Sequence, residues 1–295
     1  MAVPVLRLHQ ELATQTYKPG PYEQFEIREP KVRKICSSIF RDRVVHHAII
    51  NVVEPYFERR LIKDSYACRQ GMGSHAAMHR AQEFAMKNKF YLKCDIRKYF
   101  ETIDHGVLKV LLRRIFKDEK LIRLFDQVID HAAPGADPGK GIPIGNLSSQ
   151  HFANLYLGEL DHHVKEVLRV EGFARYMDDF ICFDDSKEQL HVVLEAIRTF
   201  TGEKLKLLLK EKVVRIAPVS EGVPFLGFRV FPNLIRLQRP NLVRFRKNMR
   251  KKQRLYKNGL ISESEMAQSV GSMIAHITHA NSTMLRRSVL KRMAS

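Results

Sequence analysis

Apolar and polar positions along the chain follow patterns that predict a few short strands among several helices. Residues 90–95 form a short apolar run, which predicts a buried strand, and residues 173–183 form two such runs around a pair of acids, which predicts two strands joined by a tight turn. Residues 150–170 and 186–201 are predicted to be helices, and the glycines and prolines of residues 134–145 predict a loop. Strands that alternate with helices, followed by a purely helical end, predict an α+β body with a helical appendage.

The last fifth of the chain is predicted to consist of amphipathic helices. Pro240 is typical of a first helical turn, and Asn258-Gly259 is typical of a helix end. Between them, apolar residues recur at helical spacing and predict one packed face. These residues are Leu242, Phe245, Met249 and Tyr256. A second helix is predicted to begin at the capping-box pattern Ser262-x-x-Glu265.

Positive charge is concentrated in the same helical end. The chain has 50 Lys and Arg against 32 Asp and Glu, a net charge of +18, and residues 233–295 contribute 14 of the cations and only two of the acids. A cationic face without balancing acids predicts a surface that follows the phosphates of nucleic acid, and an ordinary solvated helix face is the alternative. The expected nucleic-acid-binding residues are Arg244, Arg246, Lys247, Arg250, Lys251 and Arg254.

Composition excludes several other classes of protein. Hydrophobic residues make up 44% of the chain, which is too many for a disordered protein. No run of about 18 apolar residues is present, so we expect no membrane span, and residues 1–20 lack the apolar core of a signal peptide. The four cysteines never form a CxxC pair, which favours a reducing cytoplasm over a disulfide framework or a zinc site.

Three aspartates are the candidates for metal chemistry. Asp178 and Asp179 are expected at the tip of the predicted strand pair, where two adjacent carboxylates repel each other unless a cation neutralises them. Mg²⁺ is the hard, oxygen-seeking cation that suits such a site. Strand alternation places Asp95 at the end of its strand, on the face opposite the apolar row, so Asp95 is the expected third carboxylate.

Other acids and histidines have simpler explanations. Asp104 and Asp185 each lie near the start of a predicted helix and are expected to act as caps, as is Ser74 before the helix near His75. His75 and His79 lie four residues apart on that helix, but no third metal ligand is apparent.

The segment Tyr176-Met177-Asp178-Asp179 resembles the polymerase signature of reverse transcriptases. The resemblance covers about residues 22–290, and further segments resemble the first catalytic motif, the closing motif of the palm, and two blocks of the fingers. These segments are residues 95–100, 225–227, 25–43 and 65–69. Residues 142–150 have Ile144-Gly145 followed by Ser149-Gln150, a form that resembles the enzymes of diversity-generating retroelements. The Val-Thr-Gly of retron enzymes is not found near the thumb.

The resemblance implies a right-hand polymerase of fingers, palm and thumb, with a ferredoxin-like palm and a helical, basic thumb. Residues 1–20 are expected to be a loosely ordered lead-in and residues 21–90 the fingers. Residues 91–232 would be the palm, with a fingers-like insertion near residues 106–145, and residues 233–295 the thumb.

The resemblance also implies the catalytic roles. Asp95 and Asp178 would bridge two Mg²⁺ ions, Asp179 would have a lesser role as a metal ligand, and the backbone carbonyl of Ile96 would add an oxygen. Lys212 matches a motif lysine that would donate a proton to pyrophosphate or hold a phosphate, with Lys210 as its competitor.

Further residues match the nucleotide-binding site of the family. Lys31 and Arg33 match the fingers cations that grip the triphosphate, with ordinary surface charge as the alternative. Phe100 matches the aromatic gate against a ribose 2′-hydroxyl, with a core phenylalanine as the alternative.

The loop of residues 142–150 is where the chain departs from other family members. Ile144 and Gly145 would lie under the nascent base pair, and Gln150 would support their loop. Other members have a glutamine at the Ile144 position, so its replacement puts accurate base selection in doubt.

The implied function is an RNA-directed DNA polymerase that extends a primer with deoxynucleotides. In the retroelement subfamily it would copy a template-repeat RNA, misread its adenines, and supply error-prone cDNA that diversifies a target gene. A small basic accessory protein would be a further partner, and the enzyme would act in the cytoplasm of a bacterial cell, including as a phage-encoded protein. The alternatives are a reverse transcriptase of another bacterial lineage, retron-like or serving phage defence, and a catalytically silent RNA-binding relative.

Overall fold

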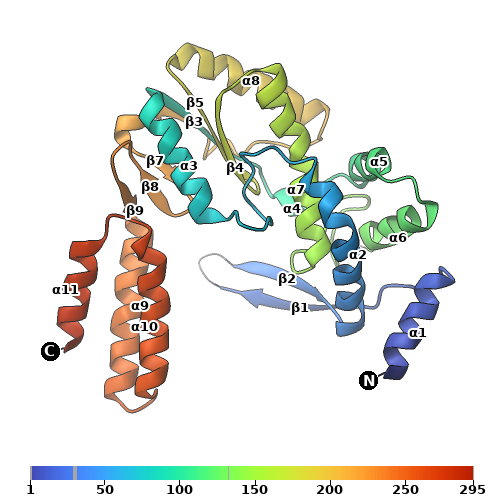
Figure 1. The fold of residues 1–295 in the computed structure, drawn as a ribbon, viewed down its shortest axis with the longest axis horizontal. Coiled ribbons are helices and arrows are strands. Elements are labelled where there is room, and N and C mark those ends of the chain that lie inside the picture. Colours follow the sequence, from blue (N-terminus) through green and yellow to red (C-terminus); the bar gives the residue numbers. More distant parts are fainter. Residues whose placement is uncertain (1, 29–31, 132, 295) are drawn as a thin grey trace.

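A four-stranded antiparallel sheet lies at the centre of the computed structural model, which describes residues 2–28, 32–131 and 133–294 (Figure 1). Its strands follow the order β4-β5-β3-β6. They are β3 (Phe90–Asp95), β4 (Gly172–Tyr176), β5 (Asp179–Asp184) and β6 (Arg215–Pro218). The α+β class, the buried strand at residues 90–95 and the strand pair at residues 173–183 are therefore confirmed.

Strand alternation divides the interior into two cores. Leu92 and Cys94 of β3 belong to one core, which contains residues of the long helices α7 (Leu147–His162) and α8 (Lys187–Glu203). Tyr91, which faces the other way, belongs to a second core with α3 (Ser74–Lys87). Helices therefore cover both faces of the sheet. The chain continues from α7 into one turn of π-helix at His163–Val167.

A two-stranded hairpin and several helices lie beside the central sheet. The hairpin is formed by β1 (Tyr22–Ile27) and β2 (Arg33–Ser38), and α2 (Phe40–Glu58) follows it and packs against α7 (Figure 1). Lys31 lies outside the described residues. After β3 come α4 (Tyr99–Thr102), α5 (His105–Ile115) and α6 (Glu119–Asp130), and α5 packs against α6.

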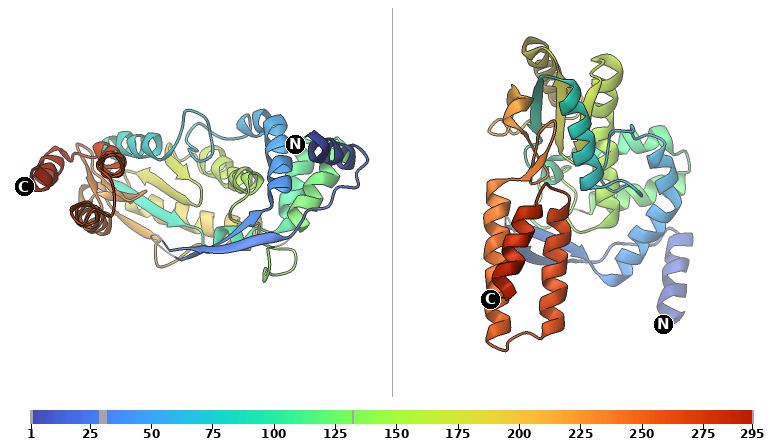
Figure 2. Two further views of the ribbon diagram at one scale, coloured as in Figure 1. Left: turned by 90° about the horizontal axis from the view of Figure 1, so that it is seen from below. Right: turned by 60° about the vertical axis from the view of Figure 1, so that its left-hand side comes forward.

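The C-terminal end is a small sheet followed by three helices. The sheet comprises β7 (Val223–Phe225), β8 (Phe228–Val230) and β9 (Ile235–Leu237), and a single-turn helix at Val219–Glu221 precedes it. The helices are α9 (Arg239–Lys257), α10 (Glu263–Thr278) and α11 (Thr283–Ala294). Figure 2 shows these helices side by side, extending away from the sheets. They share a separate core that includes Phe245, Met249 and Met266.

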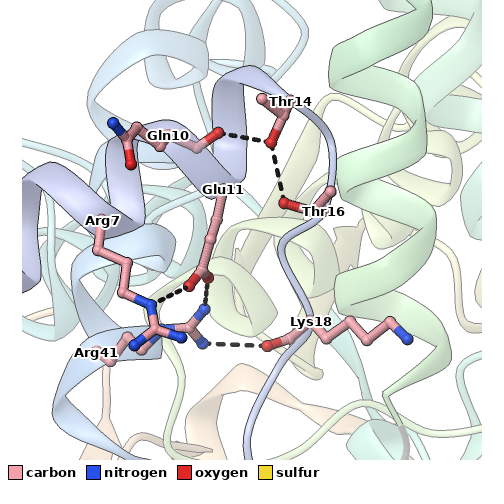
Figure 3. Close-up of a pocket in the computed structure, with 7 residues that line it drawn as sticks. All are labelled: Arg7, Gln10, Glu11, Thr14, Thr16, Lys18 and Arg41. Carbon is pink, nitrogen blue, oxygen red and sulfur yellow. Dashed lines mark hydrogen bonds and ion pairs between the residues drawn. The ribbon is translucent and has the colours of Figure 1, made fainter.

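The first twenty residues are more ordered than the sequence indicates. Ala2–Ala13 form the helix α1, Leu8 is buried, and Arg7 and Arg41 both pair with Glu11 (Figure 3). Tyr17 is also buried and donates a hydrogen bond of 2.9 Å to Asp42 in α2. The expectation of a loosely ordered lead-in is wrong because Glu11 and Tyr17 contact side chains of α2, and local composition does not reveal such contacts.

Helix boundaries test the predictions for the caps. The side chain of Asp104 accepts a hydrogen bond from the Val107 amide, and the box of Ser262 with Glu265 is complete, so both predictions are confirmed. Asp185 does not cap α8, because Ser186 does so while Asp185 accepts a hydrogen bond from the Lys89 amide.

Two smaller predictions about helices are wrong. Ser74 is the first residue of α3 and does not cap it, because Gly73 occupies the cap position. Tyr256 is 44% exposed, whereas Phe245 and Met249 are buried, because the packed face of α9 does not extend to its last turn.

His46 of α2 holds the hairpin and the start of α7 together. Its Nδ1 lies 2.8 Å from the Ser148 hydroxyl, and its Nε2 lies 3.2 Å from the Ser38 hydroxyl. Ser38 in turn donates a hydrogen bond of 2.8 Å to Asn146. Burial lowers the pKa of His46 to about 4, with a partial opposing effect of Asp42. The imidazole is therefore neutral in the folded protein at pH 7.

This shift predicts a loss of stability in mild acid. Below the unfolded pKa of 6.5, the unfolded chain binds a proton that the folded chain does not accept until about pH 4, so stability falls as the pH drops through that range. From pH 7 to pH 5 we expect His46 to contribute a decrease of about 2 kcal/mol in the free energy of unfolding. Urea titrations at both pH values should show a smaller decrease in the free energy of unfolding for His46→Gln than for the parent protein. His79→Gln, at an exposed position of α3, is the matched control, and equal decreases in the two variants would contradict the assignment.

Candidate active site

The register of β3 and β5 brings the three predicted acids to one edge of the sheet. Asp95, the last residue of β3, lies opposite Asp179, the first residue of β5. The backbone amide of Ile96 donates a hydrogen bond of 3.3 Å to the carbonyl of Asp178. Residues from two separate parts of the sequence therefore meet at the turn between β4 and β5.

The conformation of this turn is held by a buried arginine. Met177 has a positive φ of 57°, which a residue other than glycine adopts only when its surroundings enforce it. Arg175 donates a hydrogen bond of 3.0 Å to the Met177 carbonyl and is itself fully buried. Arg175 thus fixes the direction in which the two acids leave the sheet. Arg175 was not among the predicted site residues, although an arginine within an apolar strand is a detectable signal.

Asp95 and Asp178 form a pair with unfavourable electrostatics. The pKa of Asp178 is raised by burial and, after that, by the negative charge of Asp95. A hard cation between the two carboxylates would remove both penalties, so their oxygens are a suitable ligand set for a divalent metal ion. Among the residues that the structure describes, no group of three His, Cys, Asp or Glu side chains has the arrangement of a complete metal site.

Asp179 points to a different partner. Its carboxylate forms an ion pair with Lys93, which lies two residues before Asp95 on β3 and is almost completely buried. The structure therefore brings Asp179 close to the other acids through the backbone, but joins its side chain to a lysine that the sequence analysis did not consider.

The lysine that lies beside Asp95 is Lys210. Its amide donates a hydrogen bond of 2.8 Å to the Asp95 carbonyl, and its Nζ lies 3.6 Å from Asp95 Oδ1. Lys212, which the sequence analysis preferred, is exposed in the next turn. An isolated β-bridge between Ile96 and Leu209 explains why Lys210 and not Lys212 lies beside Asp95, because the bridge fixes Lys210 opposite Asp95.

The loop of Ile144 and Gly145 lies against the hairpin. The Cys36 amide of β2 donates a hydrogen bond of 2.9 Å to the Ile144 carbonyl. A Cβ atom on Gly145 would lie 2.9 Å from the Cys36 carbonyl oxygen, and its φ is 135°, so only glycine fits here. The Gln150 side chain accepts a hydrogen bond of 3.4 Å from Cys68, while Asn146, which the sequence analysis missed, connects the loop to Ser38.

Phe100 and Arg33 lie on the elements that border this loop. Phe100 is half-buried in α4, and its carbonyl accepts a hydrogen bond of 2.8 Å from the Ile142 amide. The centres of the Phe100 and Tyr99 rings lie 5.7 Å apart in an edge-to-face arrangement, so one side of the Phe100 ring packs against Tyr99. Arg33 begins β2 and is exposed.

The basic residues of α9 lie largely on its solvent side. Five of the six expected nucleic-acid-binding residues are exposed, namely Arg246, Lys247, Arg250, Lys251 and Arg254. Arg244 is half-buried and donates a hydrogen bond of 3.1 Å to Asn241. Because Phe245 and Met249 pack into the helical core, the five exposed cations lie on the solvent side of α9.

No helix among the residues that the structure describes is both long and apolar enough to cross a membrane.

Similar solved structures agree with the fold. The chain is similar to apo telomerase from Candida tropicalis truncated from its C-terminal domain, with a TM-score of 0.59 and 13% identity. The match covers 76% of this chain and 55% of that one. The predicted right-hand polymerase fold is therefore confirmed, whereas the boundaries expected for its parts remain predictions.

Sequence relatives and a family model identify the family of the chain. The chain is 25% identical to Protein YkfC of Escherichia coli, over 78% of this chain and 72% of the relative. It is 23% identical to the group II intron-encoded protein LtrA of Lactococcus lactis, over 77% of this chain and 49% of the relative. Residues 18–230 match the model of the reverse transcriptase (RNA-dependent DNA polymerase) family, whose members generally use divalent metal ions. The chain therefore belongs to the reverse transcriptase family.

Proposed function

We propose that this protein is an RNA-directed DNA polymerase that makes error-prone cDNA from a template-repeat RNA for a diversity-generating retroelement. The observation that carries the polymerase function is the pairing of Asp95 with Asp178 at the end of β3, within a chain of the reverse transcriptase family. Two Mg²⁺ ions bound there would activate the primer 3′-hydroxyl and stabilise the leaving pyrophosphate. Asp95, Asp178 and the carbonyl of Ile96 are the proposed ligands, and Asp179 is proposed as a further ligand with a lesser role.

The neighbouring residues have proposed roles that match their positions. Lys210, beside Asp95, would hold a phosphate of the incoming nucleotide in preference to Lys212. Arg33, at the start of β2, would contact the triphosphate, and Lys31 is proposed with it from the resemblance alone. Phe100 would restrict the space beside C2′ of the sugar, because its ring is held against Tyr99 at one edge.

The retroelement function rests on the loop at Ile144. Its backbone is fixed by Cys36 and Gly145, so the identity of the side chain at position 144 is the variable part. Isoleucine has no hydrogen-bonding group for an incoming base, which supports weak base selection, and the errors are proposed at template adenines from the family resemblance. Template RNA, primer, deoxynucleotides and a small basic accessory protein are the proposed partners, in a bacterial cytoplasm.

A reverse transcriptase of another lineage is the second candidate. The similarity to LtrA, which is a group II intron-encoded protein, favours it. The chain spans about half the length of LtrA, so any activity of the remainder of that protein does not transfer. Flanking DNA with two near-identical repeats that differ at adenines would support the retroelement function, and a locus without such repeats would favour this second candidate.

The proposed metal site predicts that Asp178→Asn abolishes primer extension. The substitution removes one carboxylate ligand but little volume, so we expect extension with Mg²⁺ to fall by roughly 10³-fold while RNA binding stays close to that of the parent. Asp185→Asn is the matched control, because Asp185 is an exposed acid one strand length away. Near-normal extension by Asp178→Asn would refute the site.

The basic face of α9 predicts a change in salt dependence. Replacing Arg246, Lys247 and Lys251 together with glutamine should weaken binding to unrelated RNA sequences alike. The slope of log K against log salt should decrease by about 2–3, since each lost phosphate contact lowers it by about 0.7–0.9.

A variant with equal loss of charge elsewhere provides the control for this experiment. Glutamine at Lys87, Lys187 and Lys204, which are exposed on or beside α3 and α8, should leave the slope almost unchanged. If both triple variants change the slope equally, α9 does not face the nucleic acid.

The loop predicts that Ile144→Gln improves fidelity. A glutamine side chain can hydrogen-bond to the incoming nucleotide, and a gain of about 1.4 kcal/mol in discrimination would lower the error rate tenfold. Sequencing of cDNA copied from one adenine-rich RNA should show the decrease mainly opposite adenine. Ile144→Leu, which remains apolar, should retain the errors, and identical spectra for the two variants would place the infidelity elsewhere.

A further inference from the structure

Three histidines meet where the C-terminal helices contact α3. His75 lies in the first turn of α3, His276 lies in the last turn of α10, and His279 occupies the C-cap of that helix. The ring centres of His75 and His279 lie 3.3 Å apart at an interplanar angle of 14°, so the two rings are stacked. The ring centre of His276 lies 6.3 Å from that of His75. These three residues are called the histidine cluster below.

The cluster belongs to a contact that holds the end of α10 in place. Ala280 is buried in the core that also contains residues of α3. The next residue, Asn281, donates a hydrogen bond of 2.8 Å from its amide to the Ile235 carbonyl, and its side chain accepts one of 2.7 Å from the Ile235 amide. This turn is therefore a second attachment of the C-terminal helices, besides the chain segment that links β9 to α9.

The electrostatic surroundings of His75 are unfavourable for a proton. Burial lowers the pKa of His75 first, and the other two histidines of the cluster and His79 lower it further. Glu83, the acid of α3, forms an ion pair with Arg80. The charged residues of β4, β5 and β8, the strands that pack against α3, have other partners. These are Arg175 with Asp161, Asp179 with Lys93, Asp184 with the Ser186 amide, and Arg229 with the Gly222 carbonyl.

A buried nitrogen of His75 adds to this effect. Its Nε2 is buried and has no hydrogen-bond partner among the residues that the structure describes. A protonated imidazole donates through both nitrogens, so charging His75 would bury a donor without an acceptor. A second proton on His279 would add repulsion between two rings that are in contact. The contact between α3 and α10 therefore favours uncharged rings.

We propose that the histidine cluster makes the attachment of α10 to α3 sensitive to pH. The stacked His75 binds a proton only below the ordinary histidine pKa of 6.5, whereas the released ring binds one near that value. The attachment is therefore strongest above pH 6.5 and weakens as the pH falls through it. For one proton, its equilibrium constant should fall by up to about tenfold between pH 7.5 and pH 5.5.

The consequence of release concerns the direction of α9. Without the attachment at α3, the C-terminal helices would be joined to the sheets only through the segment between β9 and α9. The basic face of α9 would then lose its fixed orientation relative to the central sheet. The inference does not depend on the polymerase function proposed above.

Hydrogen exchange of one backbone amide tests the attachment without a polymerase assay. The Asn281 amide, which is bonded to Ile235, becomes able to exchange when the end of α10 is released. In the intact protein, with EDTA present, its protection factor is measured at both pH values and corrected for the intrinsic effect of pH on exchange. From pH 7.5 to pH 5.5 the protection factor should fall by about tenfold.

Phenylalanine at either stacked position keeps a flat ring but cannot bind a proton. In His75→Phe and in His279→Phe, the protection of the Asn281 amide should change by less than about twofold over the same pH range. His191→Phe, which replaces an exposed histidine of α8, is the matched control and should behave like the parent. Equal losses of protection in the parent and in both stacked-position variants would overturn the inference.

A reversal of charge gives a second, independent test. His279→Asp places a carboxylate beside His75, which favours the charged ring. The protection of the Asn281 amide should then be at least as high at pH 5.5 as at pH 7.5, and a loss equal to that of the parent would contradict the proposal. If the parent is protected at pH 7.5 only when EDTA is omitted, a bound metal ion makes the attachment and the inference is wrong.

Discussion

The ion pair of Arg175 with Asp161 is the constraint on which the geometry of the site depends. Both side chains are completely buried, and the guanidinium donates two hydrogen bonds of 2.6 Å to the two carboxylate oxygens. Its remaining donors bind Ser65, Asn154 and the carbonyl of Met177. Burial raises the pKa of Asp161, and Arg175 opposes that shift. One arginine therefore connects α7, the segment before α3, and the turn that carries Asp178.

A buried pair of this kind specifies a structure more than it stabilises one. The desolvation of two charges offsets much of their attraction, so an apolar pair of equal volume can be as stable. An apolar pair has no donor for the Met177 carbonyl, however, and the positive φ of Met177 would lose its support. The same argument applies to Lys93, whose ammonium is fixed by Asp179 and Phe225 together. Both cations therefore connect separate elements beside the acids of the turn.

Local patterns in the sequence predicted the helices and strands, whereas contacts between distant segments could be predicted only in part. The strand at residues 90–95 and the turn at Asp178 follow from periodicity, and the capping box of α10 follows from its spacing. Lys210 and Lys212 could not be separated in this way, because the choice depends on the bridge of Ile96 to Leu209. The burial of Leu8 likewise depends on residues far along the chain. Strand alternation made Asp95 the candidate for the third carboxylate, and the resemblance added its shared role with Asp178 in binding the metal ions.

The loop beside the site separates what the fold fixes from what it leaves variable. The backbone at Ile144 is held by a hydrogen bond from β2, and Gly145 leaves no room for a side chain against Cys36. Asn146 continues this attachment through Ser38 to His46. Each of these contacts uses backbone atoms or neighbouring side chains, and none uses the side chain of Ile144. A substitution at this one position therefore alters the chemistry offered to a base without altering the frame that presents it. In the proposed function, selectivity would then evolve independently of stability, since the groups responsible for each are different.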